Sequence, residues 1–278
     1  MKIGNSKLKK NVIFGTGASS YKDYNGLYTV ISAAFEKGIL GFDTAPSYGT
    51  EEILSRCLAQ CMNEYDVGHS DVYIQTKVDA WQMMESGEQI KMYVTDIMGK
   101  MQLDYLDALL IHWPVPEYLE KTWEAFAELR DSGVVHHIGI CNVRMRQLNT
   151  FLDWDVKPEI IQIERNPLRT CAREVAFCHE YGIDIQAYSP LCKFHEDIRI
   201  STLLADIADK HKKNIGQVVM RWHIDTGVVP IFTSKKPSRV KEYSELSDFA
   251  LGLDEIKAIN GMNKDYKMYL EACACPGF

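Results

Sequence analysis

Four polar residues of the kinds used in proton transfer end or follow short apolar runs in the first half of the chain. Asp43 ends "GFD", Tyr48 comes five residues later, Lys77 ends "YIQTK" and His112 ends "LLIH". A tyrosine with its ordinary pKa of about 10 exchanges protons poorly at neutral pH unless a nearby ammonium favours its phenolate form. An aspartate can hold that ammonium in place, and a histidine can orient a carbonyl group. The set predicts a site that gives a proton to a developing alkoxide, and such a site needs a bound hydride donor.

Each of these residues also has an ordinary structural role open to it. Asp43 could cap a helix, although Thr50 is closer to the expected helix start and is the better candidate for the cap. Lys77 could be a solvated charge at the rim, and His112 could be a hydrogen-bonded core histidine. A lysine buried near a strand end needs a partner, however, and Asp43 on the neighbouring strand can provide it. That pairing favours a functional role for the whole set.

The elements that carry these residues are predicted from apolar runs that alternate with longer amphipathic stretches. The eight expected strands begin at Val12, Gly41, Val72, Leu106, His136, Glu159, Asp184 and Val228. Helices are expected between them, for example over residues 26–38, 50–62, 117–133 and 214–227. Eight such units in about 250 residues predict a (β/α)8 TIM barrel of the α/β class, with its chemistry at the carboxyl ends of the strands. A doubly wound open sheet is the alternative.

The rest of the chain is expected to belong to the same domain. No linker interrupts the alternation, so residues 1–278 are predicted to form one barrel domain. A short N-terminal hairpin around Gly4 and Asn5 is expected to cap the barrel, and an irregular C-terminal tail is expected after Gly261.

Composition and charge argue against several classes of protein. No run of about 18 uncharged apolar residues is present and the first residues lack the pattern of a secretion signal, so a soluble cytoplasmic protein is expected. The formal net charge of −7 argues against nucleic-acid binding. The eight cysteines are expected to be reduced thiols. Neither Cys57 with Cys61 nor Cys273 with Cys275 has partners at zinc spacing, so no metal site is expected.

Several segments together resemble the motifs of the aldo-keto reductase family. They are "GFDTAPSYGTEEIL", "IQTKV", "LLIHWP", "IQIERNPL" and "AYSPL", in the order and spacing of that family over essentially the whole chain. The resemblance implies a (β/α)8 barrel that binds NADPH, or less often NADH, and reversibly reduces an aldehyde or ketone to an alcohol. It implies Tyr48 as the general acid, Lys77 and Asp43 as its activating pair, and His112 as the residue that orients the carbonyl.

The same resemblance implies further residues around the cofactor and the substrate. Asn142 and Gln162 would hold the nicotinamide carboxamide, and Tyr188 would stack under the nicotinamide ring. The remaining implied contacts are Thr16 after the first strand, Ser189 and Leu191 at the pyrophosphate, Ser234, Arg239 and Glu242 around the adenosine, and Trp113 in the substrate pocket beside Tyr48 and His112.

The chain departs from the family pattern at several of these motifs. Thr233 stands where the family usually has a lysine before the phosphate-binding serine, but Arg239 is retained and can grip a phosphate with two bonds, so NADPH is still preferred. The "K-x-W" after the third strand is replaced by Lys77, Val78 and Asp79, with Trp81 displaced. Fewer aromatic walls predict a more open and more polar pocket.

Other functions fit the sequence less well. A Rossmann-type enzyme would need a complete glycine motif, and "GTGASS" lacks the final glycine. A metal-dependent hydrolase would need more ligands at strand ends than Asp43 and His112. A cofactor-binding regulatory protein without turnover would be expected to relax the catalytic set and keep the cofactor loop, whereas here the reverse holds. The expected partner is a small carbonyl or alcohol, and the expected state is a monomer, with a homodimer as the alternative.

Overall fold

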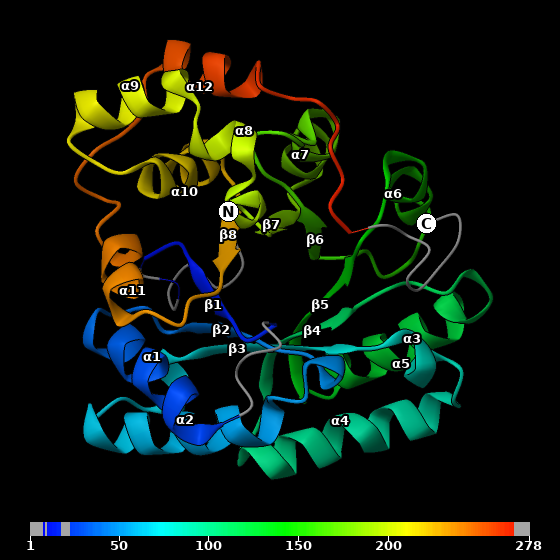
Figure 1. Ribbon diagram of the computed structural model, residues 1–278. Coiled ribbons are helices and arrows are strands. Elements are labelled where there is room, and N and C mark those ends of the chain that lie inside the picture. The colour runs from blue at the N-terminus through cyan, green and yellow to red at the C-terminus, as the bar shows by residue number, and fades with distance from the viewer. Residues whose placement is uncertain (1–7, 9, 18–22, 270–278) are drawn as a thin grey trace.

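The computed structural model describes residues 8, 10–17 and 23–269, and in this part of the chain the strands close into a barrel. Neighbouring strands are parallel and follow the chain order, and the last strand pairs with the first (Figure 1). The strands are β1 (Ile13–Gly15), β2 (Gly41–Asp43), β3 (Tyr73–Val78), β4 (Leu106–Ile111), β5 (Val135–Cys141), β6 (Ile160–Glu164), β7 (Asp184–Tyr188) and β8 (Val229–Phe232). All eight expected strands are present, and the open-sheet alternative is wrong because the sheet has no free edge.

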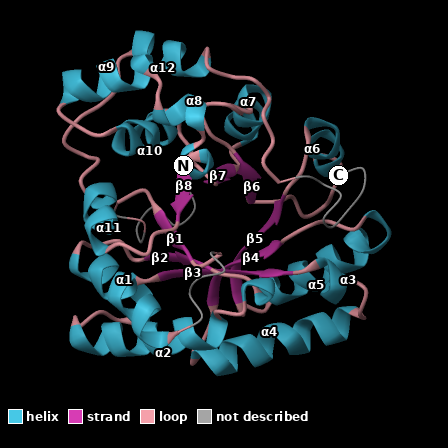
Figure 2. Ribbon diagram, viewed as in Figure 1, coloured by secondary structure: helices cyan, strands magenta, loops and turns pink. Residues whose placement is uncertain are grey.

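Helices surround the outside of this barrel (Figure 2). Within the described residues they are α1 (Tyr24–Glu36), α2 (Glu51–Glu64), α3 (Ala80–Met83), α4 (Gly87–Met101), α5 (Leu119–Asp131), α6 (Met145–Phe151), α7 (Ala172–Tyr181), α8 (Glu196–Arg199), α9 (Thr202–His211), α10 (Ile215–Asp225), α11 (Pro237–Ser244) and α12 (Leu253–Asn260). The four helices expected over residues 26–38, 50–62, 117–133 and 214–227 correspond to α1, α2, α5 and α10. The predicted hairpin at Gly4 and Asn5 lies outside the described residues, as do Cys273 and Cys275 of the tail.

Thr50 precedes α2 as expected, but its side chain does not cap the helix. Its hydroxyl donates to Oγ1 of Thr16 at 2.9 Å and lies 3.3 Å from Oγ1 of Thr44. The three threonines are buried together under the strand ends, so the hydroxyl has near partners that compete with the helix amides. The predicted capping bond is therefore wrong, although the helix boundary is right.

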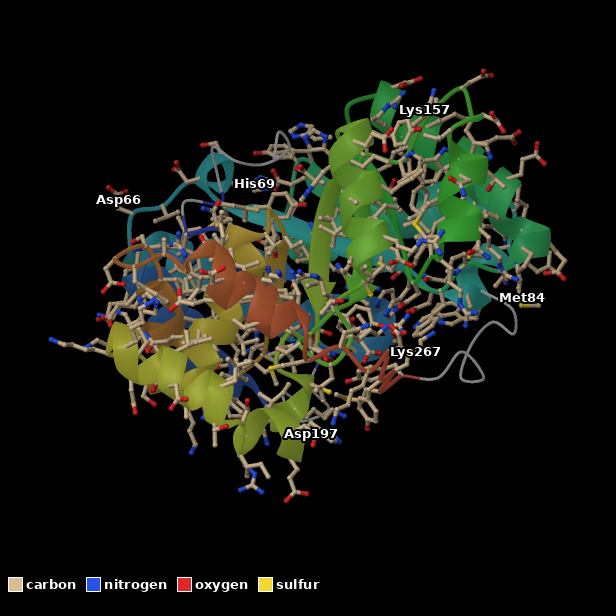
Figure 3. The ribbon with its side chains drawn as sticks, turned by 90° about the horizontal axis from the view of Figure 1, so that it is seen from above. Asp66, His69, Met84, Lys157, Asp197 and Lys267 are labelled. Atoms are coloured by element: carbon tan, nitrogen blue, oxygen red, sulfur yellow. The ribbon has the colours of Figure 1, made fainter. Side chains whose placement is uncertain are left out.

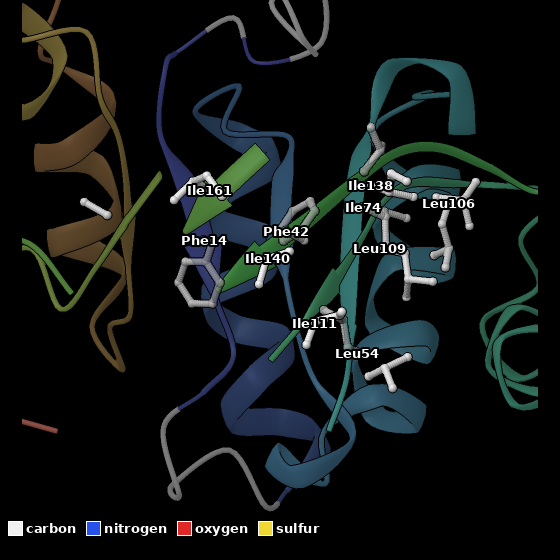
Figure 4. Packing of buried hydrophobic residues seen from close by; sticks show 14 of the residues in the cluster. Phe14, Phe42, Leu54, Ile74, Leu106, Leu109, Ile111, Ile138, Ile140 and Ile161 are labelled. Atoms are coloured by element: carbon white, nitrogen blue, oxygen red, sulfur yellow. The ribbon is translucent and has the colours of Figure 1, made fainter. Parts of the chain in front are cut away.

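Apolar side chains pack on both faces of the barrel wall, because successive residues of a strand point to opposite sides. Outward-facing residues such as Phe42, Ile74 and Ile140 meet the helices, as Leu54 of α2 illustrates (Figure 4). A separate inward-facing cluster fills the barrel and contains Leu8, Ile13, Tyr73, Ala108, Leu110, Cys141, Ile160, Val229 and Ile231. The interior is a packed core, so the chemistry must occur at one of its ends.

Gly139 on β5 marks the tightest approach inside the barrel. A Cβ atom at this position would lie 2.4 Å from the carbonyl oxygen of Ile160 and 2.6 Å from Cδ2 of Leu110. One of these contacts is with backbone, which cannot rotate away, so only glycine fits here without shifting a neighbouring strand.

The two ends of the barrel are formed by different sets of loops. In the view from above, His69 and Lys157, which precede β3 and β6, lie in one half of the molecule, and Asp197 and Lys267, which follow β7 and β8, lie in the opposite half (Figure 3). The four residues of the predicted catalytic set end or follow strands, so they belong to the same end of the barrel as Asp197 and Lys267.

Two other expectations concern the chain as a whole. The described helices include none that is long and apolar enough to cross a membrane. The six cysteines in the described residues all carry free thiols, as expected, and most of them are buried.

Candidate active site

Lys77 and Asp43 form a buried ion pair where β2 and β3 end. Lys77 is fully enclosed and Asp43 is 3% exposed. Nζ of Lys77 lies 2.8 Å from each carboxylate oxygen of Asp43 and donates to the carbonyl oxygen of Thr44 at 2.8 Å. Burial opposes the charge of Lys77, but the Asp43 carboxylate outweighs it and the pKa of Lys77 is raised. The lysine therefore remains an ammonium at neutral pH.

Asp43 also belongs to a layer of polar side chains inside the barrel. Gln75 Nε2 donates to Oδ2 of Asp43 at 2.6 Å, and Gln162 Nε2 donates to the same oxygen at 3.2 Å. Both of these amide groups also donate to Oε1 of Gln186, at 2.8 and 3.0 Å. Because a buried carboxylate is costly unless donors surround it, this layer stabilises the ion pair and fixes its position.

Tyr48 is held over the ion pair by a single turn of 3-10 helix, η1 (Pro46–Tyr48). Proline begins the turn, and Gly49 ends it in a left-handed conformation with φ of 65°. The hydroxyl of Tyr48 accepts a hydrogen bond from Nζ of Lys77 at 3.3 Å and lies 3.5 Å from Nε2 of His112. The structure thus brings the four predicted residues together at one point.

The pKa of Tyr48 is raised above its ordinary value. Burial of the hydroxyl raises it, and the Lys77 ammonium lowers it only in part. The residue as a whole is only partly exposed. The lowering effect expected of the lysine is present, but burial has the larger effect, because the cost of burying a phenolate exceeds the gain from one ammonium. At neutral pH Tyr48 carries its proton.

A cavity of about 640 Å³ opens directly above these residues. The predicted site residues in its wall are Asp43, Tyr48, His112, Trp113, Asn142, Gln162, Tyr188, Ser189, Leu191 and Arg239. The hydroxyl of Tyr188 donates to Oδ1 of Asn142 at 2.7 Å, and Nδ2 of Asn142 donates to the carbonyl oxygen of His112 at 2.8 Å. These bonds tie β5 and β7 to the end of β4, so the wall is a connected structure.

Four predicted residues lie outside this wall, and three of them are buried. Lys77 is beneath it, under Tyr48. Thr16 is fully buried, and its hydroxyl group lies 3.2 Å from the carbonyl oxygen of Asp43 and 3.0 Å from Oγ1 of Thr44. Ser234 is also buried, with its hydroxyl 3.0 Å from the backbone nitrogen of Lys236. The contacts of Thr16 and Ser234 therefore stabilise the loops around the cavity.

Glu242 lines a second cavity of about 510 Å³, which adjoins the first. Arg239 and Phe194 are in the walls of both cavities. The guanidinium of Arg239 lies over the ring of Phe194, 5.3 Å from its centre. A cation is thus placed where the two cavities meet, which is a suitable position for a phosphate group of an extended ligand.

Sequence reasoning gave no role to Asp79, which contacts the predicted set directly. Its Oδ1 lies 2.5 Å from Nδ1 of His112. The carboxylate two residues after Lys77 is visible in the sequence, but by itself it indicates only the loss of an aromatic wall.

Lys193 and Tyr269 also line the first cavity without having been predicted. The cation could have been noticed in "LCKF", directly after the "AYSPL" motif. Tyr269 gave no local signal, because its position depends on a distant anchor. The backbone nitrogens of Met268 and Tyr269 donate to the two carboxylate oxygens of Glu164, at 2.8 and 3.1 Å.

Comparison with known proteins decides the family. Residues 11–264 match the sequence profile of the aldo/keto reductase family. The chain belongs to this family. It is 32% identical to methylglyoxal reductase DkgA of Escherichia coli (strain K12) over 243 residues, which are 86% of each chain. It is 31% identical to glyoxal reductase of Bacillus subtilis (strain 168) over 256 residues, which cover 92% of this chain and 90% of that one.

A solved structure gives the same result for the fold. The aldo-keto reductase AKR2E4 of Bombyx mori, in complex with NADP, has a TM-score of 0.84 and 29% identity, covering 92% of this chain and 90% of that chain. The predicted family and barrel fold are confirmed. This aldo/keto reductase is an oxidoreductase. Two of its relatives are named as reductases of methylglyoxal and glyoxal, and the Bombyx mori enzyme was solved with NADP bound.

Proposed function

We propose that this aldo/keto reductase uses NADPH to reduce an aldehyde or ketone to an alcohol, with Tyr48 as the general acid. The observation that carries the proposal is the position of the Tyr48 hydroxyl at the base of the cavity, 3.3 Å from Nζ of Lys77 and 3.5 Å from Nε2 of His112. The relatives named as reductases of methylglyoxal and glyoxal make small dicarbonyl compounds the first substrates to test.

The proton chemistry follows from these contacts. NADPH supplies a hydride when it is bound. As the substrate oxygen becomes an alkoxide, Tyr48 gives it a proton and its own oxygen gains negative charge. At 3.3 Å and an effective dielectric constant of about 20, the attraction of Lys77 for that charge is on the order of 5 kcal/mol before desolvation. Asp43 keeps the lysine charged and immobile throughout.

The residues present fit an extended dinucleotide. In the first cavity, Asn142 and Gln162 present amide groups and Tyr188 presents a ring, as a nicotinamide would require. Arg239 stands at the boundary with the second cavity, where Glu242 is found. A guanidinium forms two parallel bonds with a phosphate, and this supports the adenosine 2′-phosphate of NADPH as its ligand in preference to NADH.

Spectrophotometric turnover tests the proposal. Purified protein should oxidise NADPH when methylglyoxal, glyoxal or a generic aldehyde is added. Tyr48→Phe should lower kcat by about 10² or more, the usual contribution of a general acid, while NADPH affinity measured by fluorescence stays within about twofold. Tyr181→Phe is the matched control, because Tyr181 is exposed on α7, and it should keep full activity. Near-native kcat in Tyr48→Phe would refute the role of Tyr48. Absence of turnover with a panel of carbonyls and both cofactors would refute the function.

A further inference from the structure

Asp79 occupies the place of the aromatic residue in the third-strand motif of the family. Its carboxylate is buried, with the residue 4% exposed, at the point where β3 ends and α3 begins. Trp81, two residues later, is 59% exposed and packs edge-on against Tyr93. A buried carboxylate therefore lies against His112, while the nearby Trp81 is exposed.

Both carboxylate oxygens of Asp79 have hydrogen-bond partners. Its Oδ1 lies 2.5 Å from Nδ1 of His112 and accepts from the hydroxyl of Ser47 at 3.0 Å, while its Oδ2 accepts from the backbone nitrogen of Ser47 at 2.8 Å. Burial raises the pKa of Asp79, but the bonds to His112 and Ser47 outweigh burial and lower it. Asp79 is therefore ionised at neutral pH, and an ionised carboxylate only accepts hydrogen bonds.

This acceptor determines where the imidazole hydrogen resides. The short contact requires a hydrogen on Nδ1 of His112. A neutral imidazole has one ring hydrogen, so Nε2 is bare and faces the Tyr48 hydroxyl at 3.5 Å. The ammonium of Lys77 can only donate, so it occupies a lone pair of the Tyr48 oxygen and leaves the tyrosine hydrogen free to point at Nε2. The donors thus run in one direction, from Lys77 through Tyr48 and His112 to Asp79.

We propose that Asp79 is a positioning residue that keeps the hydrogen of neutral His112 on Nδ1, so that Nε2 can donate to a substrate carbonyl only after the ring gains a second proton. The catalytic consequence rests on the proposed carbonyl reduction. A neutral ring in this tautomer cannot perform the carbonyl-orienting role expected of His112, because that role needs a hydrogen on Nε2. Reduction is then favoured as the pH falls.

The charges around the ring define the pH range of this effect. The titratable groups facing His112 are Asp79 before α3, Lys77 on β3, Asp43 on β2 and Tyr48 in η1. Burial lowers the pKa of His112, the bond to Asp79 raises it, Lys77 lowers it, and the net direction is down. The pH above which kcat/KM for carbonyl reduction begins to fall should therefore lie below the ordinary histidine pKa of about 6.5.

Nitrogen-15 NMR of histidine-labelled protein reads the tautomer without any turnover, because protonated and bare ring nitrogens have widely separated shifts. His112→Gln assigns the signal. At a pH of about 8 the wild type should show a hydrogen on Nδ1 and a bare Nε2. In Asp79→Asn, the backbone N–H of Ser47 still needs an acceptor and takes the amide oxygen, so the amide NH₂ faces Nδ1 and the hydrogen moves to Nε2. Ser47→Ala keeps both the carboxylate and that N–H, and should keep the wild-type tautomer.

Kinetics test the consequence for the reaction. The assay measures kcat/KM for carbonyl reduction between a pH of about 5 and about 9. In the wild type, kcat/KM should fall about tenfold for each pH unit above the pKa of His112, whereas kcat/KM of Asp79→Asn should change less than about threefold over the same range. A wild type with its hydrogen on Nε2, or an Asp79→Asn variant that keeps it on Nδ1, overturns the inference. A wild-type kcat/KM that does not fall as the pH rises over this range also overturns the inference. The expected tautomers without any carbonyl reduction would refute the proposed function and support the assignment of Asp79.

Discussion

Lys77→Met tests the buried ion pair, because methionine roughly keeps the length of the side chain and removes its charge. The variant leaves the enclosed Asp43 carboxylate without the ammonium that lies 2.8 Å from both of its oxygens. Removing one partner of a buried pair typically lowers the free energy of unfolding by about 3 to 5 kcal/mol. Gln75 and Gln162 still donate to Asp43, so we expect the lower end of that range, about 3 kcal/mol.

A double-mutant cycle separates the pair from its surroundings. Asp43→Asn should cost a similar amount, since it leaves the Lys77 ammonium buried. The double variant contains neither charge, so its loss should fall short of the sum of the single losses by about 1.5 kcal/mol or more. Urea unfolding of the four proteins gives these values. The exposed pair of Lys91 and Glu128, 2.7 Å apart, is the matched control, and its losses in Lys91→Met and Glu128→Gln should add.

The same variants report on the site. Loss of the Lys77 ammonium should raise the pKa of Tyr48 further, so kcat should fall steeply and any residual reduction should extend to higher pH. If the stability losses of Lys77→Met and Asp43→Asn simply add, the two residues do not act as a unit and the reasoning is refuted. Near-native kcat in Lys77→Met would refute the part that concerns Tyr48.

Three further predictions concern the cofactor, the core and the acid stability. Arg239→Ala should raise KM for NADPH about tenfold or more and that for NADH only a fewfold in steady-state assays, and equal weakening would remove Arg239 from the 2′-phosphate site. Gly139→Ala should lower the free energy of unfolding in urea by about 2 to 3 kcal/mol, because the new Cβ would lie 2.4 Å from the Ile160 carbonyl oxygen, and an unchanged midpoint would contradict this. Burial raises the pKa of Glu255, but bonds from Lys210, the Gly252 backbone and His211 outweigh it and lower the pKa to about 2. This lowered pKa stabilises the folded state at pH values above the unfolded pKa of about 4.3, and the stabilisation is lost as the pH falls toward 2. In thermal melts at several pH values, Glu255→Gln should therefore remove about 1 kcal/mol of the stability that the wild type loses in acid. An identical dependence of stability on pH in the two proteins would exclude the contribution of Glu255.

The barrel and the convergence of the four candidate residues could be predicted because the signals are local. A strand buried on both faces reads as an apolar run, and a polar residue that ends such a run must lie at the end of the strand. Asp43, Lys77 and His112 each have this pattern, and parallel strands place their ends together. The single-domain organisation of residues 1–278 stays a prediction.

The contacts that the sequence could not supply depend on distances between remote segments. Asp79 and His112 are separated by 33 positions, and nothing near either residue indicates that they touch. The pKa of Tyr48 depends on a balance between burial and one ammonium, and residue types alone do not give the degree of burial. Thr50 had the right place for a cap, but Thr16 and Thr44 offered its hydroxyl closer partners.

The anchoring of Met268 and Tyr269 by Glu164 has a consequence for the order in which the site is completed during synthesis. The ribosome delivers these two residues only after all eight strands. Without them the enclosed carboxylate of Glu164 has neither of its backbone donors, and Tyr269 is missing from the cavity wall. The part of the cavity beside β6 and β7 therefore takes its final form only when the last described residues are in place, and a chain stopped before Met268 would have an incomplete cavity wall.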